Sequence, residues 1–171
     1  VDDMGITHDS DEAQGYKELK DDWGLRYECS EYLVSDNEHY ASCIDKVYRE
    51  NETDFTLGDI KTTYVLDKES VRWQLSIYAY FFELQNPGCN AVRLIGIWLR
   101  GKNHEIVEVE RIPSEVVMNL LKCDSEGRQF VNPYSISPVT LPDEYRKMER
   151  TIQEIVSQAK YWSDKKKEIT D

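Results

Sequence analysis

Asp45, Asp59 and Lys61 are the residues of this chain whose types and spacing best suit phosphate chemistry. Alternate side chains of an extended strand share one face, so Asp59 and Lys61 are expected on one face and Ile60 in the core. If the residues around Asp45 form the neighbouring strand, joined through a polar turn at 49–54, its carboxylate reaches the same face. Two close carboxylates repel each other unless a divalent cation joins them. Mg²⁺ suits this arrangement, because it binds through one or two carboxylates and accepts phosphate oxygens as further ligands.

Gln74 and Tyr78 are the second feature of this kind. They are four residues apart in an expected helix, which places them on one helix face, one turn apart. There they can hydrogen-bond a substrate backbone or brace Lys61. The alternative for Asp59 and Lys61 is a simple exposed ion pair on a strand. Both residue types are disfavoured in strands, so two charges at this point need an explanation.

The elements that must position these residues follow from the hydrophobic pattern. Strand-like segments at about 25–35, 40–48 and 55–63 predict an antiparallel meander. A largely buried helix is expected at 70–85, ending at Asn86, Pro87 and Gly88. A central strand at 91–99, an alternating partner at 106–112 and a short helix from Pro113 to about Cys123 follow. The predicted fold class is therefore α/β of the α+β kind, with a mixed central sheet flanked by helices.

The two ends of the chain give weaker signals. Residues 1–24 are polar and acidic and predict a poorly defined segment with weak helical character around 12–19. Residues 142–168 carry an apolar stripe that predicts a long final helix. That helix packs on its own sheet or serves a protein partner or a second copy. The 171 residues are enough for one core, so a single domain spanning 1–171 is expected.

The composition limits the classes of function. A net charge of −12 argues against a broad nucleic-acid-binding surface, although local patches matter more than the sum. Lys61, Arg72, Arg93 and Arg100 are predicted to form such a local positive patch beside the metal. The longest apolar run, at 91–99, is too short to cross a bilayer, and no leader opens the chain. A cytoplasmic protein without a membrane partner is expected, and the four cysteines lack the C-x-x-C spacing of zinc sites.

The order of these motifs resembles the PD-(D/E)XK nuclease superfamily. Asp45 on one strand, Asp59-Ile60-Lys61 on the next and Gln74 with Tyr78 on the following helix are similar to its RecB-type branch. The match spans about residues 25–99, and the later segments at 97–101 and 108–113 look similar to phage-encoded or prophage-encoded members. The resemblance implies a restriction-endonuclease-like core.

The resemblance also implies roles for individual residues. Asp45 and Asp59 would hold Mg²⁺ or Mn²⁺, with the backbone carbonyl of Ile60 as a further ligand. Lys61 would position or activate the attacking water. Gln74 and Tyr78 would shape the site and contact nucleic acid.

Two departures from the family pattern are visible. Ile44 stands where the superfamily name expects proline. The family also supplies a Glu or His from a helix ahead of the first strand, and here that helix is poorly marked. His8 and Glu12 are the candidates for this ligand, with a solvated chain end as the alternative, and Glu31 is a further candidate.

The function expected from the resemblance is Mg²⁺-dependent hydrolysis of DNA phosphodiester bonds, as an exonuclease in phage-type recombination or repair. One alternative is a catalytically inactive nuclease-fold module that binds nucleic acid or a protein partner. Another is a metal-dependent hydrolase that acts on a small phosphorylated substrate.

Overall fold

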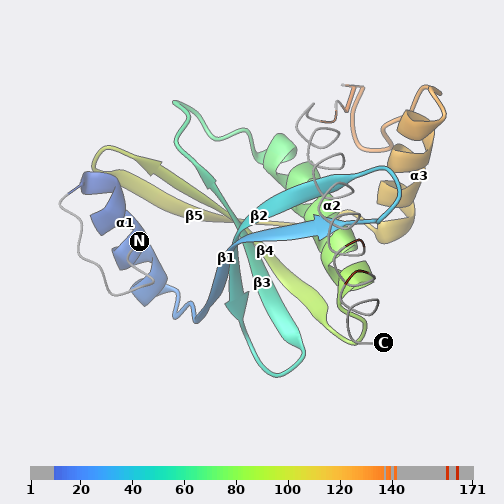
Figure 1. Ribbon diagram of the computed structural model, residues 1–171. Coiled ribbons are helices and arrows are strands. Elements are labelled where there is room, and N and C mark those ends of the chain that lie inside the picture. The colour runs from blue at the N-terminus through green and yellow to red at the C-terminus, as the bar shows by residue number, and fades with distance from the viewer. Residues whose placement is uncertain (1–9, 137, 140, 142–160, 162–164, 166–171) are drawn as a thin grey trace.

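The computed structural model describes residues 10–136, 138, 139, 141, 161 and 165. These residues form a mixed five-stranded sheet with three helices, an α+β arrangement (Figure 1). The elements in chain order are α1 (Asp11–Asp22), β1 (Tyr27–Ser35), β2 (Ala41–Arg49), β3 (Asp54–Lys61), α2 (Lys68–Gln85), β4 (Asn90–Arg100), β5 (Asn103–Val109) and α3 (Ser114–Ser125). The mixed sheet and its flanking helices agree with the sequence-based expectation.

The strands lie in the sheet in the same order as in the chain, β1-β2-β3-β4-β5. All neighbouring pairs are antiparallel except β3 and β4, which are parallel. A parallel pair needs a crossover connection, because a tight hairpin reverses the direction of the chain. α2 is that crossover, and it packs on one face of the sheet, against β4, β1 and β3 (Figure 1).

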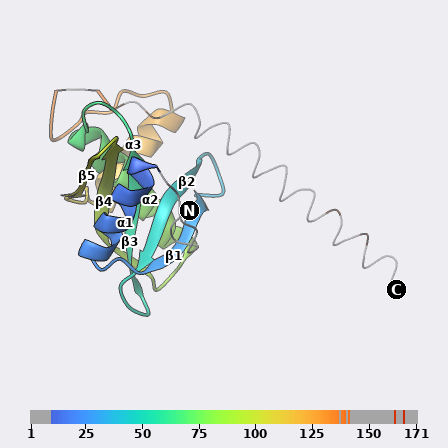
Figure 2. The same ribbon diagram turned by 90° about the vertical axis from the view of Figure 1, so that its left-hand side faces the viewer.

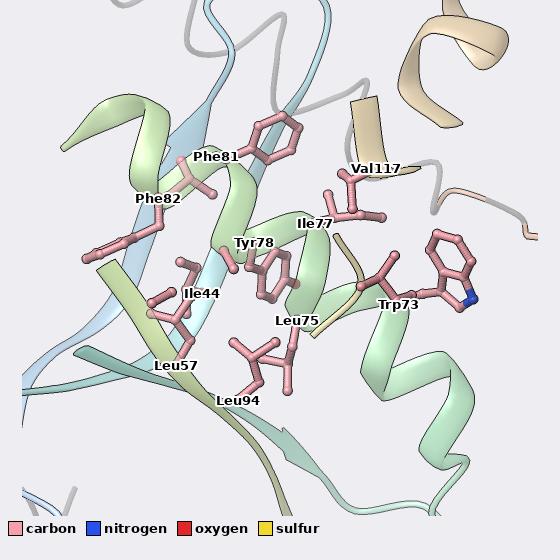
Figure 3. Close-up of a cluster of buried hydrophobic side chains, with 14 of the residues drawn as sticks. Ile44, Leu57, Trp73, Leu75, Ile77, Tyr78, Phe81, Phe82, Leu94 and Val117 are labelled. Atoms are coloured by element: carbon pink, nitrogen blue, oxygen red, sulfur yellow. The ribbon is translucent and has the colours of Figure 1, made fainter. Parts of the chain in front are cut away.

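The sheet has a separate apolar cluster on each face. On one face α2 and α3 cover residues from the central strands, including Ile44, Leu57 and Leu94 beneath α2 (Figure 3). On the other face α1 packs against β4 and β5, with Tyr16 and Leu19 facing the sheet. Figure 2 shows α1 in front of the sheet and α2 behind it. Helices thus cover both faces of the sheet. This explains why the central strands carry apolar side chains on both faces.

The helix α1 at Asp11–Asp22 is longer and better defined than the weak helical character that the sequence indicated around 12–19. Ser10 is its N-cap, because its Oγ accepts the Ala13 N–H at 3.1 Å, a cap worth about 1 kcal/mol. Gly15 is a poor helix former, but a Cβ there would lie 2.9 Å from Nδ1 of His104 on β5. Gly15 therefore allows α1 to approach the sheet closely, a tertiary effect that local propensity does not reveal.

The remaining boundaries shift by a few residues. β5 begins at Asn103 and ends at Val109, earlier than the expected 106–112, because its pairing with β4 starts directly at the Arg100–Asn103 turn. Ile112 follows the strand as a buried residue whose N–H donates to Oγ of Ser76 at 2.9 Å. The final helix expected at 142–168 lies outside the described residues, apart from 161 and 165. No helix in the described part of the chain is long and apolar enough to span a membrane.

Candidate active site

The site begins where β2 and β3 part. Their antiparallel pairing runs from Arg49 and Phe55 to Lys46 and Gly58 and stops there. Each strand continues with its other neighbour, β2 with β1 and β3 with β4. The next N–H of β3 that points toward β2 belongs to Ile60, and it donates to Oδ2 of Asp45 at 2.8 Å. A carboxylate therefore takes the place of the missing strand partner.

Ile60 contributes its backbone at this point, while its side chain packs on the α1 face of the sheet. The N–H and C=O of one strand residue point to the same side of the strand. The Ile60 carbonyl is therefore directed to the same edge as its N–H, beside Asp45. This geometry is compatible with the carbonyl ligand implied by the family resemblance.

Asp59 and Lys61 lie on the α2 face of β3, two residues apart. Asp59 is 2% exposed, and the Lys61 Nζ lies 3.0 Å from its Oδ2. Among the described residues no aligned hydrogen bond reaches this oxygen, so the ammonium is held to it by charge. A buried carboxylate oxygen whose neighbour is a cation is a position that suits a metal ion as well as a lysine.

Gln74 on α2 joins the two charges. Its Oε1 accepts from Lys61 Nζ at 2.9 Å, while its Nε2 donates to Asp59 Oδ1 at 3.2 Å and to the Tyr78 hydroxyl at 2.8 Å. A lysine offers only donors and an ionised carboxylate only acceptors, so these neighbours fix the orientation of the amide. Gln74 and Tyr78 thus brace the charged pair from the helix, as their spacing of four predicts.

The electrostatics of the site are set by burial. Desolvation raises the pKa of Asp59 from 3.8 to about 6, the Lys61 ammonium opposes this shift, and the nearby Asp45 carboxylate adds to it. Burial likewise raises the pKa of the Tyr78 hydroxyl, although hydrogen bonds with Ser42 and Gln74 partly oppose the rise. Tyr78 is therefore a neutral hydrogen-bonding group near pH 7, whereas Asp59 is a carboxylate whose charge is unfavourable in the absence of a strong cation.

The local sequence explains how α2 reaches the site. Asp67 caps the helix, because its Oδ1 accepts the Ser70 N–H at 3.2 Å. Gly96 is the β4 residue paired with Asp59, and a Cβ there would lie 3.1 Å from Cγ1 of Val71 on α2. The absence of a side chain at Gly96 lets α2 lie close over the sheet. The sequence analysis missed this role, although a glycine inside an apolar strand is a known signal of close approach.

The structure brings Asp45, Asp59, Lys61, Gln74 and Tyr78 together, and the upstream candidates have different outcomes. Glu12 lies on α1, and its Oε1 accepts the N–H of Gly101 in the β4–β5 turn at 3.0 Å. Glu31 is exposed on β1, between the pairs Ser30–Lys46 and Tyr32–Ile44, so its backbone lies across from Asp45. His8 lies outside the described residues. No group of three His, Cys, Asp or Glu side chains in the described part of the chain could hold a metal ion.

The predicted positive patch of Lys61, Arg72, Arg93 and Arg100 is wrong for two of its members. Arg93 lies on the opposite sheet face, where it pairs with Glu50 at 2.6 Å and covers the Trp23 ring. Arg72 reaches the Glu110 carbonyl at the far side of α2. It is two residues from Gln74 on a helix, so the two side chains cannot face the same way. Lys61 and Arg100 are the members that remain beside the site.

Comparisons with known proteins add little to this geometry. No protein-family model matches the chain, and no curated protein matches it. The crystal structure of SSO0001 is similar to the chain with a TM-score of 0.44 and 16% sequence identity, over 73% of this chain. The chain spans 57% of the length of that protein. Similarity at this level leaves the function to be argued from the site.

Proposed function

We propose that this protein is a metal-dependent nuclease that hydrolyses DNA phosphodiester bonds, as an exonuclease of recombination or repair. The observation that carries the proposal is the contact of the half-buried Lys61 ammonium with the buried Asp59 carboxylate, braced by Gln74 beside Asp45 at the edge where β2 and β3 part. Fold stability alone does not explain this arrangement, because burying Asp59 works against its charge. A site that binds cations and phosphate needs such a carboxylate.

The donor set fits Mg²⁺ or Mn²⁺. Asp45, Asp59 and the Ile60 carbonyl are all oxygen donors, the type that these ions prefer. Oδ2 of Asp59 is buried without an aligned hydrogen bond among the described residues, so it has capacity for a cation. When bound, a divalent ion would supply Lewis-acid polarisation of the phosphate and lower the pKa of water.

The protein's own groups have distinct tasks in this proposal. An ammonium has three N–H donors, and the hydrogen bond with Gln74 occupies one of them, while Asp59 attracts the group by charge. In this proposal another N–H serves the attacking water or a phosphate oxygen, where negative charge develops in the transition state. Gln74 keeps the ammonium at this position, and Tyr78 in turn fixes Gln74. Asp45 accepts the Ile60 N–H and so holds in place the end of β3 that carries Asp59 and Lys61.

The decisive experiment is the release of nucleotides from linear DNA with and without Mg²⁺. The wild-type chain should cut only with the metal, and Asp59→Asn should lower the rate by at least about 10²-fold, the usual loss for one electrostatic group of an active site. Asp22→Asn is the matched control, because this carboxylate is exposed on α1, on the other sheet face. Equal cleavage by wild type and Asp59→Asn would contradict the proposal.

A specific observation favours one alternative. The described residues bring only two carboxylates together, and the Lys61 ammonium already neutralises one of them. A nuclease-fold module that binds nucleic acid or a protein partner without cutting it would need no further ligand. Binding of DNA without any metal-dependent cleavage by the wild-type chain would support this alternative.

A further inference from the structure

The loop that connects β3 to α2, residues 62–67, presents exposed apolar side chains directly beyond Lys61. Tyr64 is 78% exposed and Val65 is 70% exposed. Single exposed apolar residues are common on protein surfaces, so exposure alone means little. What sets this loop apart is its place between the strand of Lys61 and the helix of Gln74, together with the contacts that hold it.

Two side chains of β4 fasten the loop backbone. The indole Nε1 of Trp98 donates to the Thr63 carbonyl at 2.7 Å, and a guanidinium nitrogen of Arg100 donates to the Thr62 carbonyl at 3.4 Å. Within the loop the Thr63 hydroxyl donates to the Val65 carbonyl at 2.8 Å. The exposure of Tyr64 is therefore not a consequence of a loose backbone, because the sheet holds the residues before it.

These fastening residues share the face of the candidate active site. Trp98 is the β4 residue paired with Lys61, so both side chains project to the same face. Arg100 follows two residues later and projects the same way. Tyr64 is three residues beyond Lys61, and three residues of chain span at most about 11 Å. The loop surface thus lies within reach of the nucleotides next to a phosphate bound at Lys61.

The Tyr64 ring is covered on one side by a cation. The Arg100 guanidinium carbon lies 4.9 Å from the ring centroid, a cation–π contact, and both groups are exposed. A base can stack on an exposed aromatic ring, and a guanidinium beside the ring can bind the phosphate of the same strand. A tyrosine and an arginine held together in this way can bind both parts of an unpaired nucleotide, the base by stacking and the phosphate by charge.

We infer that Tyr64 and Arg100 form a stacking platform for an unpaired DNA base, so that the active site receives single-stranded DNA or a frayed end. The inference rests on the proposed nuclease function for the identity of its ligand. An unpaired base is required, because in a duplex each base face is covered by its neighbours. Stacking also provides sequence-tolerant affinity with few basic residues, which suits a chain with a net charge of −12.

The test is binding of a fluorescent oligothymidylate to the full chain, measured by anisotropy in EDTA so that no cleavage occurs. Tyr64→Ser should raise the Kd about tenfold, within the range for loss of one stacked base, and Tyr64→Phe should keep it within about twofold. Tyr134→Ser is the matched control, because Tyr134 is also exposed and lies under an arginine, 4.6 Å from Arg72. A Kd for Tyr64→Ser within twofold of wild type, or an equal loss in Tyr134→Ser, would overturn the platform.

A second measurement separates this inference from the proposed function. With Mg²⁺ present, the same variants are compared for cleavage of single-stranded DNA. Binding that depends on Tyr64 without any cleavage by the wild type would refute the nuclease and keep the platform. Cleavage that is lost in Asp59→Asn, with Kd and KM unchanged in Tyr64→Ser, would keep the nuclease and refute the platform.

Discussion

Asp45 acts as the strand partner of Ile60, because its Oδ2 accepts the Ile60 N–H at 2.8 Å just beyond the last β2–β3 pair. One carboxylate therefore closes the sheet edge and lies close enough to Asp59 to raise its pKa. The other sheet contacts of β3 continue past this point, since Lys61 still pairs with Trp98 on β4. β3 thus stays in the sheet through β4 after it has parted from β2, and the candidate site lies where they part.

The first prediction separates the two tasks of Asp45. Asp45→Asn keeps an oxygen that can accept the Ile60 N–H, so the free energy of unfolding should change by less than about 1 kcal/mol. Asp45→Ala leaves that N–H without its acceptor and should lower the free energy of unfolding by about 1–3 kcal/mol. Urea denaturation of both variants in EDTA measures the difference. Equal stabilities would show that the hydrogen bond does not hold the strand edge.

The second prediction concerns the charge of Asp59. Its pKa is about 6 in the folded protein against an ordinary value of 3.8, so between these pH values the folded state binds a proton that the unfolded chain has released. The free energy of unfolding must therefore fall as pH rises through this window. Above pH 6 the full penalty applies, on the order of 2–3 kcal/mol for a shift of this size.

Asp59→Asn should remove this penalty. In EDTA the variant should unfold at higher urea concentration than wild type at pH 8. The gain should shrink as pH falls from 6 toward 4, because folded Asp59 takes up a proton in this range while the unfolded chain stays largely ionised. Asp22→Asn, on exposed α1 surface, should show no such pH-dependent gain. A variant less stable than wild type at pH 8 would mean that the Lys61 ion pair outweighs the cost of burial.

The third prediction tests how α2 is placed over the sheet. In Gly96→Ala the new Cβ would lie 3.1 Å from Val71 Cγ1 and 3.8 Å from Leu66 Cδ2, so Val71 must give way by a few tenths of an ångström. Because a buried valine side chain is stiff, we expect α2 to move with it. We expect a loss of about 1–3 kcal/mol in the free energy of unfolding, typical of overpacking. Cleavage should fall as well, because the same helix carries Gln74.

Gly15→Ala provides the matched control for this prediction. Its Cβ would meet His104 at 2.9 Å on the α1 face, away from Gln74. This variant should also lose stability, but its cleavage rate in conditions where it is folded should match the wild type. An equal fall in rate for both variants would mean that the activity reports general stability and not the position of α2.

The type and approximate extent of α2 and of the strands before and after it could be predicted from the sequence. An apolar run in a strand and a period of 3.6 in a helix are local signals. The three elements β3 (54–61), α2 (68–85) and β4 (90–100) lie where these signals are. The proximity of Asp59, Lys61 and Gln74 also follows from short-range order, since a strand, a connection and a crossover helix leave few arrangements.

Residues whose place depends on long-range contacts were not predictable in this way. Glu12 is held by the Gly101 N–H, eighty-nine residues later in the chain, and no local pattern predicts that contact. The error over Arg93 has a different origin. Gly96 pairs with Asp59, so position 96 lies on the face of the candidate site. Arg93 precedes Gly96 by three residues, and side chains alternate along a strand, so Arg93 lies on the opposite face. This conclusion needs the register of β3 with β4, which the sequence does not provide.

The last prediction concerns Lys61, whose ammonium contacts Oδ2 of Asp59 at 3.0 Å, a contact that a bound metal ion would also make in the proposed function. Lys61→Ala removes both a transition-state donor and a competitor of the metal. Cleavage should therefore fall by about 10²–10³, while Mg²⁺ affinity stays equal to wild type or rises. Mg²⁺ titration by calorimetry and single-turnover cleavage measure the two effects, with the exposed Lys17→Ala on α1 as the control. A folded Lys61→Ala protein that cuts DNA at the wild-type rate would refute the assigned chemistry and leave the non-catalytic binding module as the better explanation of the site.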